Sequence, residues 1–183
     1  HSKGREVTYL LSSYNPGTVA MSLLVATFAS YVALDLAKRV RTTSRSAAFG
    51  WWAGGSIAMG TGIWSMHFVG MLAFSLPIDL GFGRVLTLLS WLAGVAASGV
   101  ALFIASGGSL NWRRLLVGAT TMGAGICAMH YLGMASMELV PGIVWDLPLV
   151  TVSGVIAMVA SAASLLIFFY LRTGHAKGAV RRQ

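Results

Sequence analysis

The sequence predicts an all-α protein, a polytopic bundle of transmembrane helices built from repeated helix pairs. Its 183 residues are 56% hydrophobic and only 10% charged, and the mean hydropathy is +0.76. Soluble domains carry about 25% charged residues, so lipid is expected to surround most of this chain. Five apolar segments have the ~20 residues that a helix needs to cross the hydrocarbon core, and two of them contain nearly the same motif.

The five segments follow one another with short connections between them. We therefore expect a single membrane domain over residues 1–183, with no room for a separate soluble domain. The lone cysteine, Cys127, excludes an internal disulfide. The predicted spans cover approximately residues 17–37, 48–73, 85–106, 115–137 and 148–171.

Local signals support these boundaries. The first helix is expected to begin beside Asn15 and Pro16, since asparagine favours the cap and proline the first helical turn. The second span carries Gly50 and Gly54, a spacing that allows close helix contact in membranes. Turns or loops are predicted at residues 77–79, 107–109, 141–142 and 146–148.

Basic residues cluster on one side of the predicted membrane. If the spans alternate in direction, ten of the 13 Lys and Arg residues fall on the side that holds the carboxyl terminus. The positive-inside rule assigns that side to the cytoplasm, so the amino terminus is expected outside. This topology accounts for the formal net charge of +8, and we predict no nucleic-acid partner. Asp35, near the inner end of the first span, is expected to pair with Lys38 or Arg39.

The repeated motif covers residues 62–71, GIWSMHFVGM, and again residues 125–134, GICAMHYLGM. Six of the ten positions are identical, and Met59-Gly60 upstream matches Met122-Gly123 at the same offset along the chain. Each copy places a Met-His pair within about two turns of the outer end of an outward-running helix. Ionisable side chains at this depth are uncommon and usually face the interior of a bundle. We therefore expect the two copies to face one shared site.

A second repeat links the inward-running spans. Residues 29–34 (ASYVAL) resemble residues 97–102 (ASGVAL), and residues 160–165 (ASAASL) are a looser third copy. The repeating unit is thus a helix pair, in which an inward helix with Ala-Ser precedes an outward helix ending in Met-His. Similar units stack by burying similar faces. The chain holds two units and half of a third, and we expect the parent protein to continue.

The paired motifs predict a copper site near the outer face. Imidazole and thioether groups form a soft to borderline ligand set, which suits copper better than hard cations such as Mg²⁺ or Ca²⁺. In a helix, a His and the Met four residues later share a face. The candidate ligands are His67, His130, Met66, Met71, Met129 and Met134. The donors expected to orient these ligands, or to fill an open position, are Tyr14, Asn15 and Tyr131.

Two histidines at matching heights also fit a bis-imidazole haem, so a haem electron-transfer membrane protein is the alternative. It requires the two imidazoles to face each other across a slot as wide as a porphyrin. A transporter is disfavoured because acidic residues inside the spans are sparse, and a structural anchor for cytoplasmic domains stays open. The sequence has no Ser-His-Asp set, carboxylate pair or phosphate-binding loop, so this membrane module is not expected to be an enzyme.

The residues around both motifs resemble the MHYT domain, a bacterial membrane sensor module. The resemblance covers SYNP at residues 13–16, ASYVALDL at 29–36, WSMHFVGMLAFSLP at 64–77 and GAGICAMHYLGMASM at 123–137. It implies a multi-pass protein of the bacterial inner membrane, in a module often fused to cytoplasmic GGDEF and EAL domains that make or break down cyclic-di-GMP. It also implies a copper site that senses oxygen, carbon monoxide or nitric oxide.

The chain departs from the family's pattern in two respects. Val69 and Leu132 stand where the name-giving threonine would be, and Phe68 replaces the tyrosine of the first copy. The family usually shows a third Met-His motif, which would follow Gln183. The resemblance therefore implies the amino-terminal part of a longer module, with the lipid bilayer, a diatomic gas and a cytoplasmic signalling domain as partners. Formation of a homo-oligomer stays open.

Overall fold

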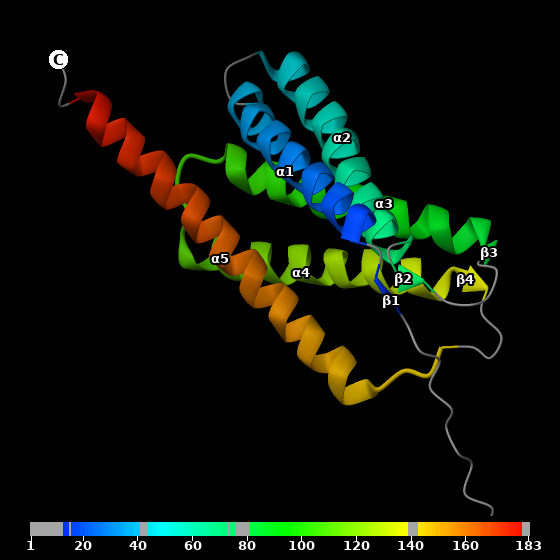
Figure 1. The fold of residues 1–183 in the computed structure, drawn as a ribbon. Helices are drawn as coiled ribbons and strands as arrows, with labels where there is room; N and C mark the ends of the chain where they lie inside the picture. Colours follow the sequence, from blue (N-terminus) through cyan, green and yellow to red (C-terminus); the bar gives the residue numbers. More distant parts are fainter. Residues whose placement is uncertain are drawn as a thin grey trace, which may run out of the picture.

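The described part of the chain is almost entirely helical. The computed structural model describes residues 13–14, 16–40, 44–72, 74–75, 81–138 and 143–180. These residues form five helices, which pack as neighbours in chain order (Figure 1). Their bounds are α1 Pro16–Arg39, α2 Arg45–Leu72, α3 Arg84–Ser106, α4 Trp112–Ala135 and α5 Leu147–Val180. Each helix coincides with one predicted span, so the predicted all-α fold is confirmed.

Four of these helices in the described part, α1, α3, α4 and α5, are long and apolar enough to cross a membrane. The remaining helix, α2, has 28 residues and is about 42 Å long at 1.5 Å per residue, which is also enough. Its glycines, serines and tryptophans keep its hydropathy below that of the other four helices. We treat α2 as a span because it packs along both α1 and α3. The chain is thus a multi-pass membrane protein.

Two helix starts follow from the local sequence. Helix α1 begins at Pro16 as predicted, where the missing proline N–H removes no helical hydrogen bond. Helix α4 is capped by Asn111, whose side-chain oxygen accepts a hydrogen bond from the backbone N–H of Arg114 at 2.8 Å. This cap places the first residue of α4 at Trp112, three residues before the predicted start at residue 115.

Two short antiparallel ladders lie at one end of the helix pairs, the end that the distribution of basic residues predicts to be the outer one. Strand β1 (Ser13–Tyr14) pairs with β2 (Phe74–Ser75), and β3 (Gly81–Phe82) pairs with β4 (Met137–Glu138). Each ladder joins the residues before an inward helix to those after the following outward helix. Figure 1 shows both ladders at the end of the bundle where α2 and α4 finish. These strands were not predicted from the sequence. Helix α4 ends at Ala135, and residue 137, the approximate end of the predicted fourth span, lies in β4.

Equivalent glycines make the closest contacts between neighbouring pairs. A Cβ added to Gly60 of α2 would lie 2.6 Å from the backbone nitrogen of Val95 in α3. A Cβ added to Gly123 of α4 would lie 2.9 Å from the backbone nitrogen of Met158 in α5. The two glycines, and likewise their two partners, are related by the offset of the Met-His motifs. The two repeats therefore dock by the same backbone contact, in agreement with a fold built from repeated helix pairs.

Two arginines make polar contacts at the opposite end of the bundle. Arg39 donates from Nε to the Oδ2 atom of Asp35 at 2.7 Å, the ion pair that the sequence predicts. Arg172 of α5 donates to the carbonyls of Gly107 and Gly108 at 2.7 and 2.8 Å. Because these carbonyls lie in the turn between α3 and α4, the guanidinium joins α5 to that turn. Helix α5 then continues well beyond the predicted end at residue 171.

Candidate metal centre

The two motif histidines lie against each other. His67 of α2 and His130 of α4 have Nδ1 atoms 3.4 Å apart. Their ring centroids are 4.8 Å apart, and the ring planes are inclined at 61°. A nitrogen-to-nitrogen distance of this size allows one imidazole to donate to the other, or both to face one small ion. The structure thus brings together the two histidines of the repeated motif.

Glycines of the same motif create the room for this contact. A Cβ at Gly125 would lie 2.8 Å from the Cβ atom of Ala97 in α3, so α3 and α4 pack closely beside the site. One helical turn after His130, a Cβ at Gly133 would lie 2.8 Å from Nε2 of His67. The motif glycine at position 133 therefore leaves the space that the imidazole of the other repeat occupies.

Aromatic rings cover the His67 side of the site. Phe68 packs on Trp64 with ring centroids 4.4 Å apart and on Phe82 with centroids 5.5 Å apart. The ring of Phe68 also meets His67 edge to face at 5.6 Å. These contacts make an apolar wall beside the imidazole.

Tyr131 lies on the other side, next to His130. Its ring meets His130 edge to face at 5.0 Å and Trp145 at 5.4 Å. Its hydroxyl hydrogen-bonds to the hydroxyl of Ser153 in α5, which also donates to the carbonyl of Val150. Tyr131 therefore contacts the histidine pair and at the same time connects α4 to α5.

The four methionines of the motifs lie in different surroundings. Met129 is only 4% exposed, and its sulfur lies 3.4 Å from the position that a Cβ on Gly94 would take. Met66 lines a cavity between the repeats. Met71 and Met134 are half-buried, each four residues after its histidine. Because residues four apart share a helix face, Met71 and Met134 are the methionines placed best to join the imidazoles.

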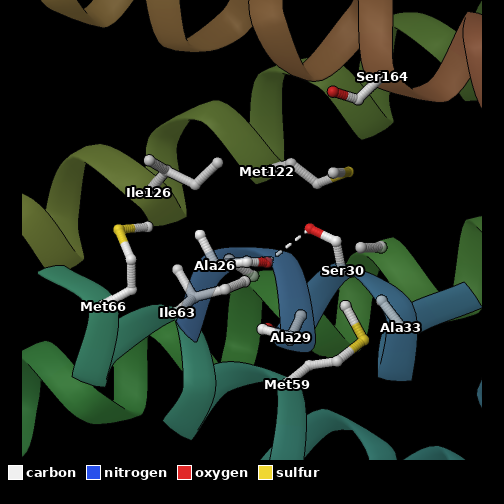
Figure 2. Close-up of a pocket in the computed structure, with 13 residues that line it drawn as sticks. Ala26, Ala29, Ser30, Ala33, Met59, Ile63, Met66, Met122, Ile126 and Ser164 are labelled. Atoms are coloured by element: carbon white, nitrogen blue, oxygen red, sulfur yellow. Dashed lines mark hydrogen bonds between the residues drawn. The ribbon is translucent and has the colours of Figure 1, made fainter. Parts of the chain in front are cut away.

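The cavity beside Met66 has a volume of about 320 Å³. Figure 2 shows Met59, Met66 and Met122 around it, with small side chains of α1 between them. Most of the lining comes as equivalent pairs from the two repeats, namely Ala29 and Ala97, Ser30 and Ser98, Ala33 and Ala101, Met59 and Met122, and Ile63 and Ile126. The cavity therefore marks the seam along which the two repeats face each other.

The histidine pair fits a small metal ion. Two nitrogen ligands at about 2.0–2.1 Å from one ion can lie up to about 4.2 Å apart, and the observed separation is 3.4 Å. The Nε2 atom of His67 is buried and has no hydrogen-bond partner among the described residues, although buried polar atoms are usually paired. No third His, Cys, Asp or Glu joins the pair within the described part of the chain. Among the motif residues, the thioethers of Met71 and Met134, each four residues after its histidine, are the remaining groups of suitable chemistry.

A haem does not fit this arrangement. A bis-imidazole haem places its porphyrin between the two imidazoles, whereas the rings of His67 and His130 are in direct contact. Imidazoles with thioethers on the same helix faces are a donor set of a kind that suits copper.

Of the residues that precede α1, the structure describes only Ser13 and Tyr14. Tyr14 lies in β1, where its backbone pairs with Phe74 just beyond the end of α2. Its side chain, like the whole of Asn15, lies outside the described residues. The roles predicted for these two residues therefore remain predictions.

Sequence reasoning missed two serines that contact the motifs. Ser22 of α1 donates to the carbonyl of Met66, and Ser90 of α3 donates to the carbonyl of Met129. A signal was present, because Ser22 and Ser90 are related by the same offset as residues 29–34 and residues 97–102. In an alanine-rich span, however, a serine is easily interpreted as a small packing residue.

Comparison with known proteins agrees with the repeats. The family model MHYT, described as a bacterial signalling protein N-terminal repeat, matches residues 7–50, 60–118 and 123–180. The starts of the second and third matches are separated by the same offset as the Met-His motifs. No solved structure matches the chain.

Three curated relatives are similar over most of this chain. It is 54% identical over 165 residues to the bifunctional diguanylate cyclase/cyclic di-GMP phosphodiesterase MucR of Pseudomonas aeruginosa, covering 90% of this chain and 24% of MucR. It is 40% identical over 161 residues to signaling protein YkoW of Bacillus subtilis. It is 38% identical over 160 residues to cyclic di-GMP phosphodiesterase NbdA of Pseudomonas aeruginosa. Each of the last two matches covers 87% of this chain and 20% of the relative.

The chain thus spans a quarter or less of the length of these relatives. The family model covers most of the chain, and its matches follow the helix pairs described above. The chain belongs to the MHYT family of bacterial signalling proteins and forms its membrane-embedded sensor module.

Proposed function

We propose that this module binds copper near the outer face of the bacterial inner membrane and senses a diatomic gas such as O₂, CO or NO. The observation that carries the proposal is the contact between His67 and His130, which come from equivalent places in two repeats. Bound copper would supply a coordination position for a diatomic ligand. The module itself is not catalytic, and the chain holds one membrane domain with its amino terminus outside.

Different residues hold the ion, orient the histidines and exclude water from the site. His67 and His130 hold the ion, and Met71 and Met134 on the same helix faces complete the soft ligand set. Tyr131 orients His130 through its edge-to-face contact. The apolar wall formed by Phe68 and its neighbours excludes water from the site.

Helix α5 carries the signal to the inner side. Tyr131 bonds to Ser153 near the outer end of α5, and Arg172 anchors the inner end of α5 to the α3–α4 turn. A ligand that favours one packing of α4 against α5 shifts the population of that packing. In a longer parent protein, the receiver is a cytoplasmic cyclic-di-GMP domain, in line with the names of MucR and NbdA.

The metal content of the purified chain tests whether the module binds copper. The 183-residue chain is purified in detergent from cells grown with and without added copper, and its metal is measured by elemental analysis and optical spectroscopy. We expect copper to copurify with the wild type and with Cys127→Ala, which removes the single thiol, but not with His67→Ala or His130→Ala. Equal copper in wild type and both histidine variants would refute the proposal, and a Soret band would favour haem.

A chimera with MucR tests whether the module senses a diatomic gas. The matching segment of MucR is replaced by this chain, and cellular cyclic-di-GMP is measured at high and low oxygen and after addition of NO or CO. The wild-type chimera should respond to at least one gas, and the His67→Ala and His130→Ala chimeras should not. A response that survives both substitutions would show that the signal is not read by the histidine pair.

A further inference from the structure

Two serines form matching hydrogen bonds beside the candidate metal centre. The hydroxyl of Ser22 in α1 lies 3.2 Å from the carbonyl oxygen of Met66 in α2. The hydroxyl of Ser90 in α3 lies 2.6 Å from the carbonyl oxygen of Met129 in α4. In each helix pair, a serine of the inward helix thus donates to the outward helix at the residue before the histidine.

The donors and the acceptors of the two hydrogen bonds occupy equivalent positions in the sequence repeats. Ser22 and Ser90 are related by the offset that also relates the two Ala-Ser segments of α1 and α3. Met66 and Met129 occupy the same position in the two copies of the Met-His motif. The same donor and the same acceptor therefore meet in both repeats, which is hard to attribute to chance packing.

Motif glycines lie next to both of these bonds. In an α-helix, the carbonyls of Met66 and Met129 already accept from the N–H groups four residues later, at Gly70 and Gly133. A carbonyl oxygen has a second lone pair, which the serine can use. A Cβ at Gly133 would lie 3.2 Å from the Ser90 hydroxyl, and a Cβ at Gly70 would lie 3.7 Å from the Ser22 hydroxyl. At Gly133 the absence of a side chain leaves the carbonyl open to Ser90, whereas at Gly70 the serine would be in ordinary contact with an added Cβ.

Each accepting carbonyl belongs to the peptide group whose nitrogen is that of the site histidine. A hydrogen bond to it restrains the rotation and the height of the histidine backbone relative to the inward helix. The Nδ1 atoms of His67 and His130 meet at 3.4 Å, and a small rotation of either helix would separate them. Partners that orient metal ligands in this way typically change metal affinity about 10–100-fold when removed.

We propose that Ser22 and Ser90 are positioning residues, which hold His67 and His130 in register for metal binding through the carbonyls of Met66 and Met129. This inference rests on the proposed copper site for its effect on affinity. The register of the two imidazoles, however, can be measured without metal.

The experiment compares Ser90→Ala with Ser98→Ala in the whole chain. Ser98 is a matched control, because it is in α3, is 2% exposed, and its hydroxyl has no hydrogen-bond partner among the described residues. For the first repeat, Ser22→Ala is compared with Ser22→Thr, which keeps a hydroxyl, and with Ser30→Ala, whose hydroxyl bonds within α1. Thermal unfolding of each variant identifies any that is grossly destabilised.

The first readout needs no metal. Imidazole ¹⁵N chemical shifts of His67 and His130 are recorded in metal-free protein and assigned with the His→Ala variants. We expect Ser90→Ala and Ser22→Ala to shift both pairs of signals, and Ser98→Ala, Ser30→Ala and Ser22→Thr to leave them near wild type. Wild-type imidazole shifts in both serine-to-alanine variants would overturn the inference.

The second readout is Cu(I) affinity, measured by competition with a chromophoric chelator. We expect Ser90→Ala to weaken Cu(I) binding about 10-fold, with Ser98→Ala unchanged. An equal loss in Ser90→Ala and Ser98→Ala would show general loosening of α3 and would also overturn the inference. Wild-type protein that binds no Cu(I) would refute the proposed function, while the imidazole shifts would still decide whether the serines position the histidines.

Discussion

The first helix pair, α1 with α2, and the second, α3 with α4, contain the same contacts in different settings. Ser90 is completely buried and its hydrogen bond measures 2.6 Å, whereas Ser22 is half-buried and its bond measures 3.2 Å. The apolar part of α3 has 39% of its residues buried, and that of α1 only 6%. Helix α3 packs along α2 and α4, while α1 packs chiefly along α2. A repeated contact is therefore stabilised to a degree set by the neighbours of its repeat.

The pairs also differ beside their histidines. The first motif carries Phe68, which packs among aromatic rings, and the second carries Tyr131, whose hydroxyl bonds to Ser153 of α5. Ser153 follows Ser90 at the offset of the Met-His motifs, so it is the third member of the serine series, with a tyrosine hydroxyl as its partner. In the proposed function, the first pair therefore mainly binds the ion, and the second both binds the ion and connects to α5.

The largest expected effect comes from the glycines that both pairs share. Gly60→Ala and Gly123→Ala each place a Cβ within 3 Å of the backbone of the next helix, and overpacking of this kind costs about 1–3 kcal/mol. Gly54→Ala is the control, because nothing lies within 4 Å of its added Cβ and alanine favours a helix by about 1 kcal/mol. Thermal unfolding in detergent should show two destabilised variants and a neutral or stabilised control. Equal unfolding temperatures for all three would contradict the docking described here.

The next largest effect is expected on Cu(I) affinity and distinguishes the glycines of the two Met-His motifs. Gly133→Ala directs a Cβ toward the His67 ring at 2.8 Å, whereas Gly70→Ala directs one toward the Ser22 hydroxyl at an ordinary 3.7 Å. We expect Gly133→Ala to move the imidazoles apart and weaken Cu(I) binding about 10–100-fold, and Gly70→Ala to stay near wild type. Chelator competition measures both, and equal affinities for the two variants would show that Gly133 does not set the spacing of the site.

A smaller effect compares the two serines by stability alone. Ser90→Ala removes a short, fully buried hydrogen bond, worth about 1 kcal/mol. Ser22→Ala removes a longer and less buried one, closer to the ~0.6 kcal/mol average for membrane helices. Unfolding in a graded denaturing detergent should rank wild type above Ser22→Ala and Ser22→Ala above Ser90→Ala. The reverse order would mean that burial does not distinguish the repeats.

The smallest effect on stability is expected for Tyr131→Phe, which makes the second motif resemble the first. The change removes the bond to Ser153, worth about 0.6 kcal/mol, and leaves the imidazoles untouched. Copper content of the purified chain should be unchanged, while the gas response of the MucR chimera should fall. A full response in that chimera would show that the tyrosine hydroxyl is not needed for coupling.

The repeats in the sequence predicted much of this molecule. Hydropathy located the helices, and the copies of Met-His predicted that His67 and His130 belong to one site, because equivalent positions on stacked units face the same way. The strands were not predictable, since a two-residue ladder has no periodic pattern. The hydrogen bond of Ser22 depends on how α1 crosses α2, and neither composition nor spacing specifies such a crossing. Helix α2 was predicted as one of the five apolar segments, although its glycines reduce its hydropathy.

Helix α5 has 34 residues and is therefore about 51 Å long, well beyond the ~30 Å of hydrocarbon that it crosses. A continuous helix transmits angle as well as displacement, because each residue turns it by about 100°. A domain joined rigidly to the Arg172 end of α5 would be oriented by the rotation of the helix about its axis at Ser153. One residue inserted after Arg172 would turn an attached domain by about 100°, while seven would return it to within about 20° of its original direction. If α5 carries the signal as proposed, that signal is a rotation of the helix, so output should follow the helical phase of an insertion and depend much less on its length.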